Sequence, residues 1–314
     1  MTGLQTHPSI PKKYIFVTGG VISGLGKGTI SASIGRLLKS RGYAVTLQKF
    51  DPYLNVDAGT TNPFEHGEVF VTEDGMEADL DLGHYERFID EELTRDGDLT
   101  SGVIYGSVID KERQGVYDGA TVQIVPNITN EIKERIAAYT PGADISIIEI
   151  GGTVGDIESM VFLEAIRQFS NEIGKQNCTF VHVVLMPYIK VSGEQKTKPA
   201  QHSVKELLGL GISPDFIICR SERPMTDESK DKIALFCNVA NGHVITNEDV
   251  DCIYEIPLRF YDERLDVKLL KKLGLDEREA DLGEWRAMIA RLKQLSRTVN
   301  IALVGKYIDN LDAY

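Results

Sequence analysis

The chain has 314 residues, of which 42% are hydrophobic and 26% charged, values typical of a globular protein with a sizeable core. Its 34 lysines and arginines against 47 acidic residues give a formal net charge of −13, which argues against general nucleic-acid or anionic-membrane binding. We find no signal peptide and no apolar run long enough to cross a bilayer, and therefore expect a cytoplasmic protein.

Apolar runs that indicate strands alternate with helical patterns along the chain. We predict strands over 14–18, 44–49, 121–125, 144–150, 179–186, 214–219 and 243–246, and helices over 27–41, 83–93, 127–138, 159–173, 200–209, 227–237 and 251–272. Two of the strands, at 145–150 and 180–185, are almost continuously apolar, as strands covered on both faces are. This order predicts an α/β fold with a mostly parallel, doubly wound sheet and helices on both faces.

Composition divides the chain into four segments. Residues 1–13 are a polar N-terminal tail, 14–275 form the α/β domain, and 276–298 are a helical connector. A fresh strand and glycine turn follow at 299–314, and we expect them to open a further domain that is missing. The four cysteines show no C-x-x-C spacing, and three lie in apolar surroundings, which favours small core residues over metal ligands or disulfides.

The most informative motif is the glycine-rich stretch 18–29, between a buried strand and a helix. Backbone N–H groups and the helix dipole would point at a phosphate there, and Lys27 would add a positive charge. The stretch departs from G-x-x-x-x-G-K-[ST], because Gly28 stands where Ser or Thr is expected and Thr29 comes one place late. The alternative is a glycine-rich turn with a surface lysine, but the flanking strand and helix favour nucleotide binding.

Carboxylates and a lysine follow other predicted strands, at the edge of the sheet where ligands bind. Lys49 and Asp51 follow the second strand, and five carboxylates lie between Glu73 and Asp81, of which we expect one to hold magnesium. Glu149 ends an apolar strand, where a carboxylate is costly unless it is paired or metal-bound. Both a magnesium ligand and a structural ion pair fit that position.

A third cluster spans 192–203, where two lysines, hydroxyls and amides precede a helix. In an acidic protein this indicates a second phosphate site, distinct from the first. The residues alone thus predict an ATP-type site with magnesium and a second anionic substrate.

Several long motifs occur in an order that resembles the synthetase (amidoligase) half of the CTP synthase family. They are 17–21, 23–28, 74–75, 81–87, 151–158 and 196–199, within a match from about Lys13 to Asp266. The resemblance implies amination of UTP to CTP in pyrimidine nucleotide biosynthesis, through a 4-phosphorylated UTP, with ATP as co-substrate and ammonia as nitrogen donor.

The resemblance also implies that the α/β fold is P-loop-like, and it implies residue roles. ATP would contact Gly24, Leu25, Gly26, Lys27, Gly28, Thr29, Asp81, Glu248, Asp249 and Val250. UTP, or CTP as product and feedback inhibitor, would contact Ser23, Asp156, Ile157, Glu158, Lys196, Thr197, Lys198, Pro199, Ala200, Gln201 and Lys232. Lys27 and Lys49 would be catalytic, Asp81 and Glu149 would bind Mg²⁺, and Pro63, His66 and Val69 would line the ammonia route.

In the family a glutaminase domain of the class I amidotransferase type supplies the ammonia, and 299–314 resemble its first strand. None of the four cysteines stands in a G-x-C-x-G elbow, so we expect this chain to use ammonia and not glutamine. The resemblance implies a homodimer to homotetramer, and filaments. Two other hypotheses remain open: a nucleotide-switched dimerising ATPase, and a chain that acts only in assembly.

Overall fold

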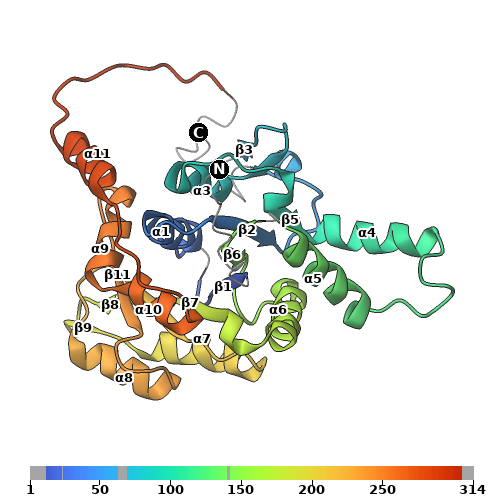
Figure 1. The fold of residues 1–314 in the computed structure, drawn as a ribbon. Coiled ribbons are helices and arrows are strands. Elements are labelled where there is room, and N and C mark those ends of the chain that lie inside the picture. The colour runs from blue at the N-terminus through green and yellow to red at the C-terminus, as the bar shows by residue number, and fades with distance from the viewer. Residues whose placement is uncertain (1–11, 23, 63–68, 140–141, 306–314) are drawn as a thin grey trace, which may run out of the picture.

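The computed structural model describes residues 12–22, 24–62, 69–139 and 142–305. Seven strands form its central sheet: β1 (Lys13–Gly19), β2 (Val45–Asp51), β5 (Asp98–Thr100), β6 (Ile145–Ile150), β7 (Cys178–Met186), β10 (Phe216–Ser221) and β11 (Val244–Glu248). They run parallel in the order β11-β10-β7-β1-β6-β2-β5 (Figure 1). Two small hairpins pair β3 (Val69–Val71) with β4 (Glu77–Asp79), and β8 (Tyr188–Ile189) with β9 (Glu194–Gln195).

Helices cover both faces of the sheet (Figure 1). One face carries α1 (Lys27–Ser40), α3 (Asp81–Ile89), α9 (Ile256–Asp262), α10 (Leu265–Leu273) and α11 (Gly283–Lys293). The other carries α4 (Ser101–Arg113), α5 (Thr129–Ala138), α6 (Met160–Ile173), α7 (Lys198–Gly209) and α8 (Asp227–Cys237). This arrangement confirms the predicted fold class.

The central strand β1 contributes to the core on both faces, because successive side chains of a strand point to opposite sides. Ile15 and Val17 pack under α1 and α3, whereas Tyr14 and Phe16 pack with the helices of the other face. The Tyr14 ring lies edge-on to Phe169 of α6 at 5.0 Å between centroids. All of β1 is buried, as the apolar run at 14–17 predicts.

The predicted strand at 121–125 is wrong. Residues 121–123 have no regular structure, and a helical turn spans Ile124–Ile128. Ile124 and Val125 are half exposed, and Pro126, which has no N–H for a sheet ladder, follows at once. The strand that completes this edge of the sheet is β5, which is three residues long and gave no sequence signal.

The helices differ from the prediction at two places, each for a local reason. The segment expected as one helix over 251–272 forms α9 and α10, which are separated where Arg264 adopts a φ of +56°. The unpredicted helix α4 contains Gly102 and Gly106, which weaken its helical pattern, and starts where the Thr100 hydroxyl accepts a bond from the Val103 N–H.

Other expectations concern the cysteines and the C-terminal residues. Cys178, Cys219 and Cys237 are buried free thiols, as expected of small core residues, and Cys252 is half-buried. Residues 299–305 are exposed and take no regular secondary structure; 306–314 lie outside the described residues. Within the described ranges, none of the helices is both long and apolar enough to cross a bilayer.

Candidate active site

The glycine-rich loop joins β1 to α1 at the carboxyl edge of the sheet. Gly24 and Gly26 have φ values of +71° and +78°, a region that glycine adopts without steric cost. Gly26 precedes the first helical residue, and no side chain caps the helix. The first N–H groups of α1 are therefore directed toward the loop, as an anion site requires.

Lys27 begins α1 and reaches the second glycine-rich loop. Its Nζ donates to the carbonyl of Gly152 at 2.9 Å, and the Val154 N–H donates to the carbonyl of Gly19 at 2.8 Å. Burial lowers the pKa of the Lys27 ammonium, an effect that nearby carboxylates, Glu149 foremost, oppose. The two glycine loops are thus held together by the lysine and by a backbone hydrogen bond.

Gly28 faces Asp81 of α3 across a gap too narrow for a side chain. A Cβ on Gly28 would lie 1.9 Å from Asp81 Oδ1. The departure from the usual Ser or Thr at this position therefore has a steric cause, because Asp81 occupies the space beside the loop.

Lys49, near the end of β2, is surrounded by carboxylates. Its Nζ donates to Asp79 at 2.8 Å and to Asp81, and lies 3.6 Å from Asp51. Burial alone would lower the pKa of this ammonium, but Asp51, Asp79, Asp81 and Glu149 together raise it well above its usual range. Lys49 is thus a fixed positive charge in the site.

Glu149 lies beside Lys49 in the sheet, because β6 pairs with β2 in the register that sets these two residues opposite each other. Its Oε2 accepts a hydrogen bond from the Tyr85 hydroxyl of α3. Burial, followed by repulsion from Asp81, raises the pKa of the Glu149 carboxyl to about 7. Two acidic groups therefore interact inside a buried site, which favours a cation between them.

These elements enclose a cavity of about 630 Å³. Its lining comprises Gly24, Leu25, Gly26, Lys27, Gly28, Thr29, Lys49, Asp51, Pro52, Tyr53, Asp79, Asp81, His84, Glu149, Gly151, Gly152, Asp156, Glu158 and Ser159. We call this the glycine-loop cavity.

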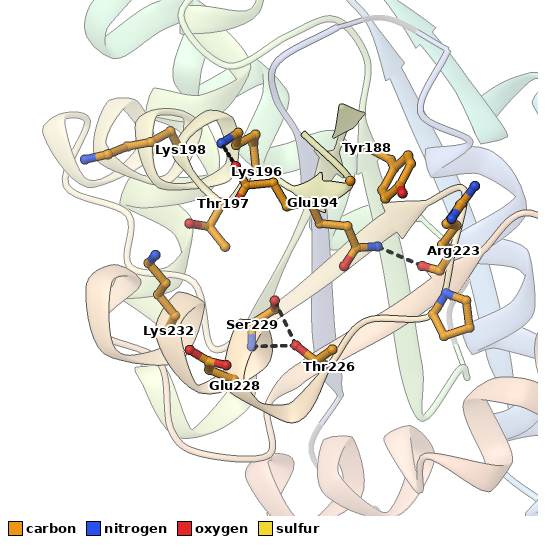
Figure 2. Close-up of a pocket in the computed structure, with 13 residues that line it drawn as sticks. Tyr188, Glu194, Lys196, Thr197, Lys198, Arg223, Thr226, Glu228, Ser229 and Lys232 are labelled. Atoms are coloured by element: carbon orange, nitrogen blue, oxygen red, sulfur yellow. Dashed lines mark hydrogen bonds and ion pairs between the residues drawn. The ribbon is translucent and has the colours of Figure 1, made fainter. Parts of the chain in front are cut away.

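A second cavity of about 550 Å³ lies at the β8–β9 hairpin and the starts of α7 and α8. Lys196, Lys198 and Lys232 line it, together with Tyr188, Arg223, Thr226 and Ser229 among others. Figure 2 shows Lys232 of α8 and Lys196 at one opening, with Lys196 bonded to Glu194, whereas the side chain of Lys198 extends away from the others. We call this the lysine cavity.

Comparison of the sequence with known proteins places the chain in a family. The sequence model of the CTP synthase N-terminus matches residues 13–275. The chain is 59% identical over 304 residues to a CTP synthase of Ruminiclostridium cellulolyticum, and 58% identical over 302 residues to one of Methanocaldococcus jannaschii; each match covers 96% of the chain. The chain belongs to the CTP synthase family.

The chain spans 57% and 56% of the length of these two CTP synthases. Among solved structures, the signal recognition particle receptor FtsY of Elizabethkingia anophelis is 13% identical, with a TM-score of 0.41 over 81% of this chain and 65% of that one. This score is too low to support an argument.

The ATP residues expected from the CTP synthase resemblance do not all lie in one place. Residues 24–29 and Asp81 line the glycine-loop cavity. Asp249 lies 2.9 Å from the Nε of Arg220, and Arg220 Nη1 donates to the carbonyl of Gly24 at 2.7 Å. Asp249 is thus tied to the glycine loop through Arg220, a residue that the sequence reasoning missed.

Glu248 and Val250 lie differently from Asp249. Glu248 accepts from Arg259 at 3.0 Å and lines a separate small cavity, whereas Val250 packs against the core. Of the expected adenine contacts, Asp249 alone has a contact connecting it to the glycine loop among the described residues.

The UTP residues expected from the resemblance are divided between the two cavities. Asp156 and Glu158 line the glycine-loop cavity, whereas Lys196, Thr197, Lys198 and Lys232 line the lysine cavity. Ile157 is 82% exposed and lines an apolar hollow with Leu54.

Three more residues of the expected UTP set belong to the start of α7. Pro199 stands in the first turn of the helix, and Ala200 is buried. Gln201 donates to the Thr197 hydroxyl at 3.0 Å.

Three site predictions fall on residues outside those described: Ser23 of the UTP set, and Pro63 and His66 of the ammonia route. Val69 begins β3 and pairs with Asp79, the aspartate that binds Lys49. Because Asp79 lines the glycine-loop cavity, Val69 lies on the strand next to the one that contributes to this cavity.

The glycine-loop cavity suits Mg²⁺ by its charge and its donors. Its described lining holds the carboxylates of Asp51, Asp79, Asp81, Glu149, Asp156 and Glu158 against the ammonium groups of Lys27 and Lys49. A polyphosphate would add more negative charge, so a hard cation with oxygen ligands fits. Within the described ranges, no group of three or more His, Cys, Asp or Glu side chains could hold a metal alone, so the fit rests on this charge balance.

Proposed function

We propose that this chain carries the ATP-dependent amination of UTP to CTP, with ammonia as the nitrogen donor. The observation that carries the proposal is the convergence of Lys27, Lys49, Asp81 and Glu149 on one cavity beneath a glycine loop, in a chain of the CTP synthase family. The lysine cavity supports a second nucleotide, because its three lysines and Arg223 outnumber Glu194 and Glu228 in its lining, in a protein of net charge −13.

The chemistry needs positioning and charge more than a nucleophilic side chain. Transfer of the γ-phosphoryl group of ATP to O4 of the uracil ring gives ADP and makes O4 a good leaving group. Ammonia then adds at C4, phosphate departs, and CTP remains after loss of a proton. Lys27 and Lys49 are cationic groups within the glycine-loop cavity and would stabilise the negative charge on the transferring group.

Asp81 and Glu149 would hold the magnesium ion, which when bound neutralises phosphate oxygens and orients them for transfer. Gly28 leaves the space in which the Asp81 carboxylate lies beside the loop. Lys49 holds the opposite side of Asp81, so this carboxylate has one orientation toward the cavity.

The divided UTP set supports a proposal about assembly. If one UTP contacts both Lys198 and Glu158, which line different cavities, a second copy of the chain can bring the two together. The exposed side chains of Leu54 and Ile157, 74% and 82% accessible, supply an apolar surface for such contact. We propose a homodimer to homotetramer that UTP and ATP favour, in the cytoplasm, where the buried free thiols would stay reduced.

The assembly proposal has a direct test by mixing inactive variants. Lys198→Ala and Glu158→Ala chains are each expected to lose activity alone and to regain part of it when mixed, because some sites would combine intact halves. A mixture that stays inactive, although sedimentation shows mixed oligomers, would place both halves of the site on one chain.

The function is tested by following CTP formation from UTP, ATP and magnesium, with an ammonium salt in one reaction and glutamine in another. We expect product with ammonia alone. Product with glutamine would contradict the expected donor. ATP hydrolysis without UTP, and no CTP in either reaction, would favour the switch ATPase; no turnover but nucleotide-dependent assembly would favour a purely structural role.

A further inference from the structure

Helix α3 contributes two side chains to the same end of the glycine-loop cavity. Asp81 is its first residue and Tyr85 follows four residues later, so the two lie on one face of the helix. Asp81 lines the cavity directly, whereas the Tyr85 hydroxyl donates to Glu149 Oε2. A single turn of α3 therefore supplies one of the two carboxylates that the proposed function assigns to the cation and donates a hydrogen bond to the other.

The Tyr85 hydroxyl is held firmly. The side chain is fully buried in the core beneath α1 and α3, where the rest of its surface is packed. Further along the same helix, Phe88 packs against Trp285 of α11 with 5.5 Å between ring centroids. A tyrosine has few rotatable bonds, so a ring fixed by packing places its oxygen at a defined point.

The direction of the hydrogen bond decides what Tyr85 does to Glu149. A phenol hydroxyl donates one hydrogen bond, and it donates to Oε2 of a carboxylate that is 2% exposed. A phenol hydroxyl keeps its proton at neutral pH, so the Tyr85 hydroxyl acts here as a donor. One carboxylate oxygen is thereby anchored, and rotation of the group about its last bond is restricted.

We propose that Tyr85 is a positioning residue that sets the orientation of the Glu149 carboxylate toward the divalent cation. This inference rests on the proposed function, because it takes Asp81 and Glu149 as the ligands. Hydrogen-bond partners of metal ligands fix ligand geometry, and their loss typically costs about 10- to 100-fold in metal affinity or activity.

The test replaces Tyr85 by phenylalanine and measures Mn²⁺ binding by electron paramagnetic resonance, with a non-hydrolysable ATP analogue present. We expect Tyr85→Phe to bind Mn²⁺ about 10- to 100-fold more weakly, and to bind the analogue without metal as the parent does. An Mn²⁺ affinity within twofold of the parent would overturn the inference, even if the variant were less stable, because a purely structural tyrosine would lower stability alone.

A matched control is Tyr43→Phe. Tyr43 is 2% exposed, and its hydroxyl donates to the carbonyl of Asp276 at 2.7 Å, away from both cavities. It removes the same oxygen from a buried tyrosine and is expected to leave Mn²⁺ binding unchanged. An equal loss in both variants would contradict a specific role for Tyr85.

Two further variants separate this inference from the proposed function. Asp81→Asn and Glu149→Gln should each weaken Mn²⁺ binding. If neither variant does, the proposed cation site is wrong. If both do while Tyr85→Phe does not, only the role of Tyr85 is wrong. In the double variant Tyr85→Phe/Glu149→Gln, the carboxyl group that would lose its hydrogen-bond partner is itself replaced. No buried acid is then left unpaired, which protects folding. This double variant should bind Mn²⁺ as Glu149→Gln alone does, and a further loss would mean that Tyr85 does not act through Glu149.

Discussion

The Asp81 carboxylate lies where a side chain on Gly28 would have to stand, with only 1.9 Å between Asp81 Oδ1 and the position of a Cβ on Gly28. The two residues come from different helices, α1 and α3, which pack side by side. The missing side chain in the glycine loop and the carboxylate beside it therefore form one feature of the site.

Gly28→Ala is expected to damage the site although alanine is the better helix former. The new methyl group must displace Asp81, and we expect metal-dependent ATP binding to weaken by at least about 10-fold. Isothermal titration calorimetry with and without Mg²⁺ measures the effect. As a matched control, Gly106→Ala in α4 meets no atom within 4 Å and should raise the free energy of unfolding by about 0.5–1 kcal/mol. Normal metal-dependent binding by Gly28→Ala would contradict the steric argument.

Lys27→Ala is expected to lower CTP formation by at least about 100-fold while the chain stays folded. The lysine contributes charge in the cavity, and the bond it makes, to the carbonyl of Gly152, joins two surface loops and not the core. The rate of CTP formation with ammonia is the measurement, and circular dichroism checks the fold. Lys205→Ala, on the exposed side of α7, is the control and should be fully active. Near-normal turnover by Lys27→Ala would remove this lysine from the mechanism.

Lys196→Ala should weaken UTP binding by about 10- to 100-fold and leave ATP binding within twofold, because a charged hydrogen bond contributes about 1.5–3 kcal/mol. Lys196 lines the lysine cavity, away from the glycine loop. Equilibrium binding of each nucleotide alone distinguishes the two effects. Lys190→Ala changes an exposed lysine in the same region that does not line the cavity, and should affect neither. Equal weakening of both nucleotides by Lys196→Ala would mean that the two sites are not separate.

Arg220→Ala should show the opposite selectivity. Arg220 bonds both the carbonyl of Gly24 and the Asp249 carboxylate, so its loss frees the glycine loop and the expected adenine contact together. We expect ATP affinity to fall by about 10-fold or more with UTP affinity unchanged. Arg223→Ala is the matched control, because Arg223 lies over the Tyr188 ring in the lysine cavity and should affect UTP alone. Unchanged ATP binding in Arg220→Ala would show that the contact is merely structural.

His182 predicts a pH dependence of stability. The ring is fully buried between the hydroxyls of Thr18 and Ser203, each 2.8 Å away, and burial lowers its pKa to about 3. Between pH 6.5 and 3 the unfolded chain binds a proton at this residue that the folded chain does not. The contribution to stability is therefore complete above pH 6.5 and is lost as the pH falls, by about 1.4 kcal/mol for each pH unit.

Urea unfolding of the parent and of His182→Gln at pH 7, 6 and 5 tests this sign. The variant cannot titrate at this position, so its free energy of unfolding should fall less steeply with pH than that of the parent. Parallel curves would show that the proton on His182 is not linked to folding.

The sequence predicted those parts of the site that are continuous or lie at strand ends. The glycine loop could be found because strand, loop, lysine and helix follow one another, and Lys49 and Glu149 because parallel strands end at a common edge. Arg220 and Tyr85 gave no such signal. Arg220 bonds Gly24, which is 196 residues away in the sequence. In the sequence Tyr85 is an ordinary core-facing residue of an amphipathic helix, and its role depends on the hydrogen bond of its hydroxyl to Glu149.

The error in predicting a strand at 121–125 has a related cause. Its residues Ile124 and Val125 are half exposed, and whether such a run joins a sheet depends on whether the rest of the chain covers it. By contrast, the break at Arg264 is a local backbone feature, but an arginine at positive φ cannot be recognised from its type.

Strand β1 supplies alternate residues to two cores that lie on opposite sides of the sheet, and the glycine loop begins where this strand ends. A slip of one residue would exchange Phe16 for Ile15 or Val17 in both cores at once, so the strand has only one workable alignment. The position of the glycine loop at the edge of the sheet is thereby fixed by the packing on both faces. Loosening either helical layer would therefore shift the glycine loop, through the strand that the two layers share.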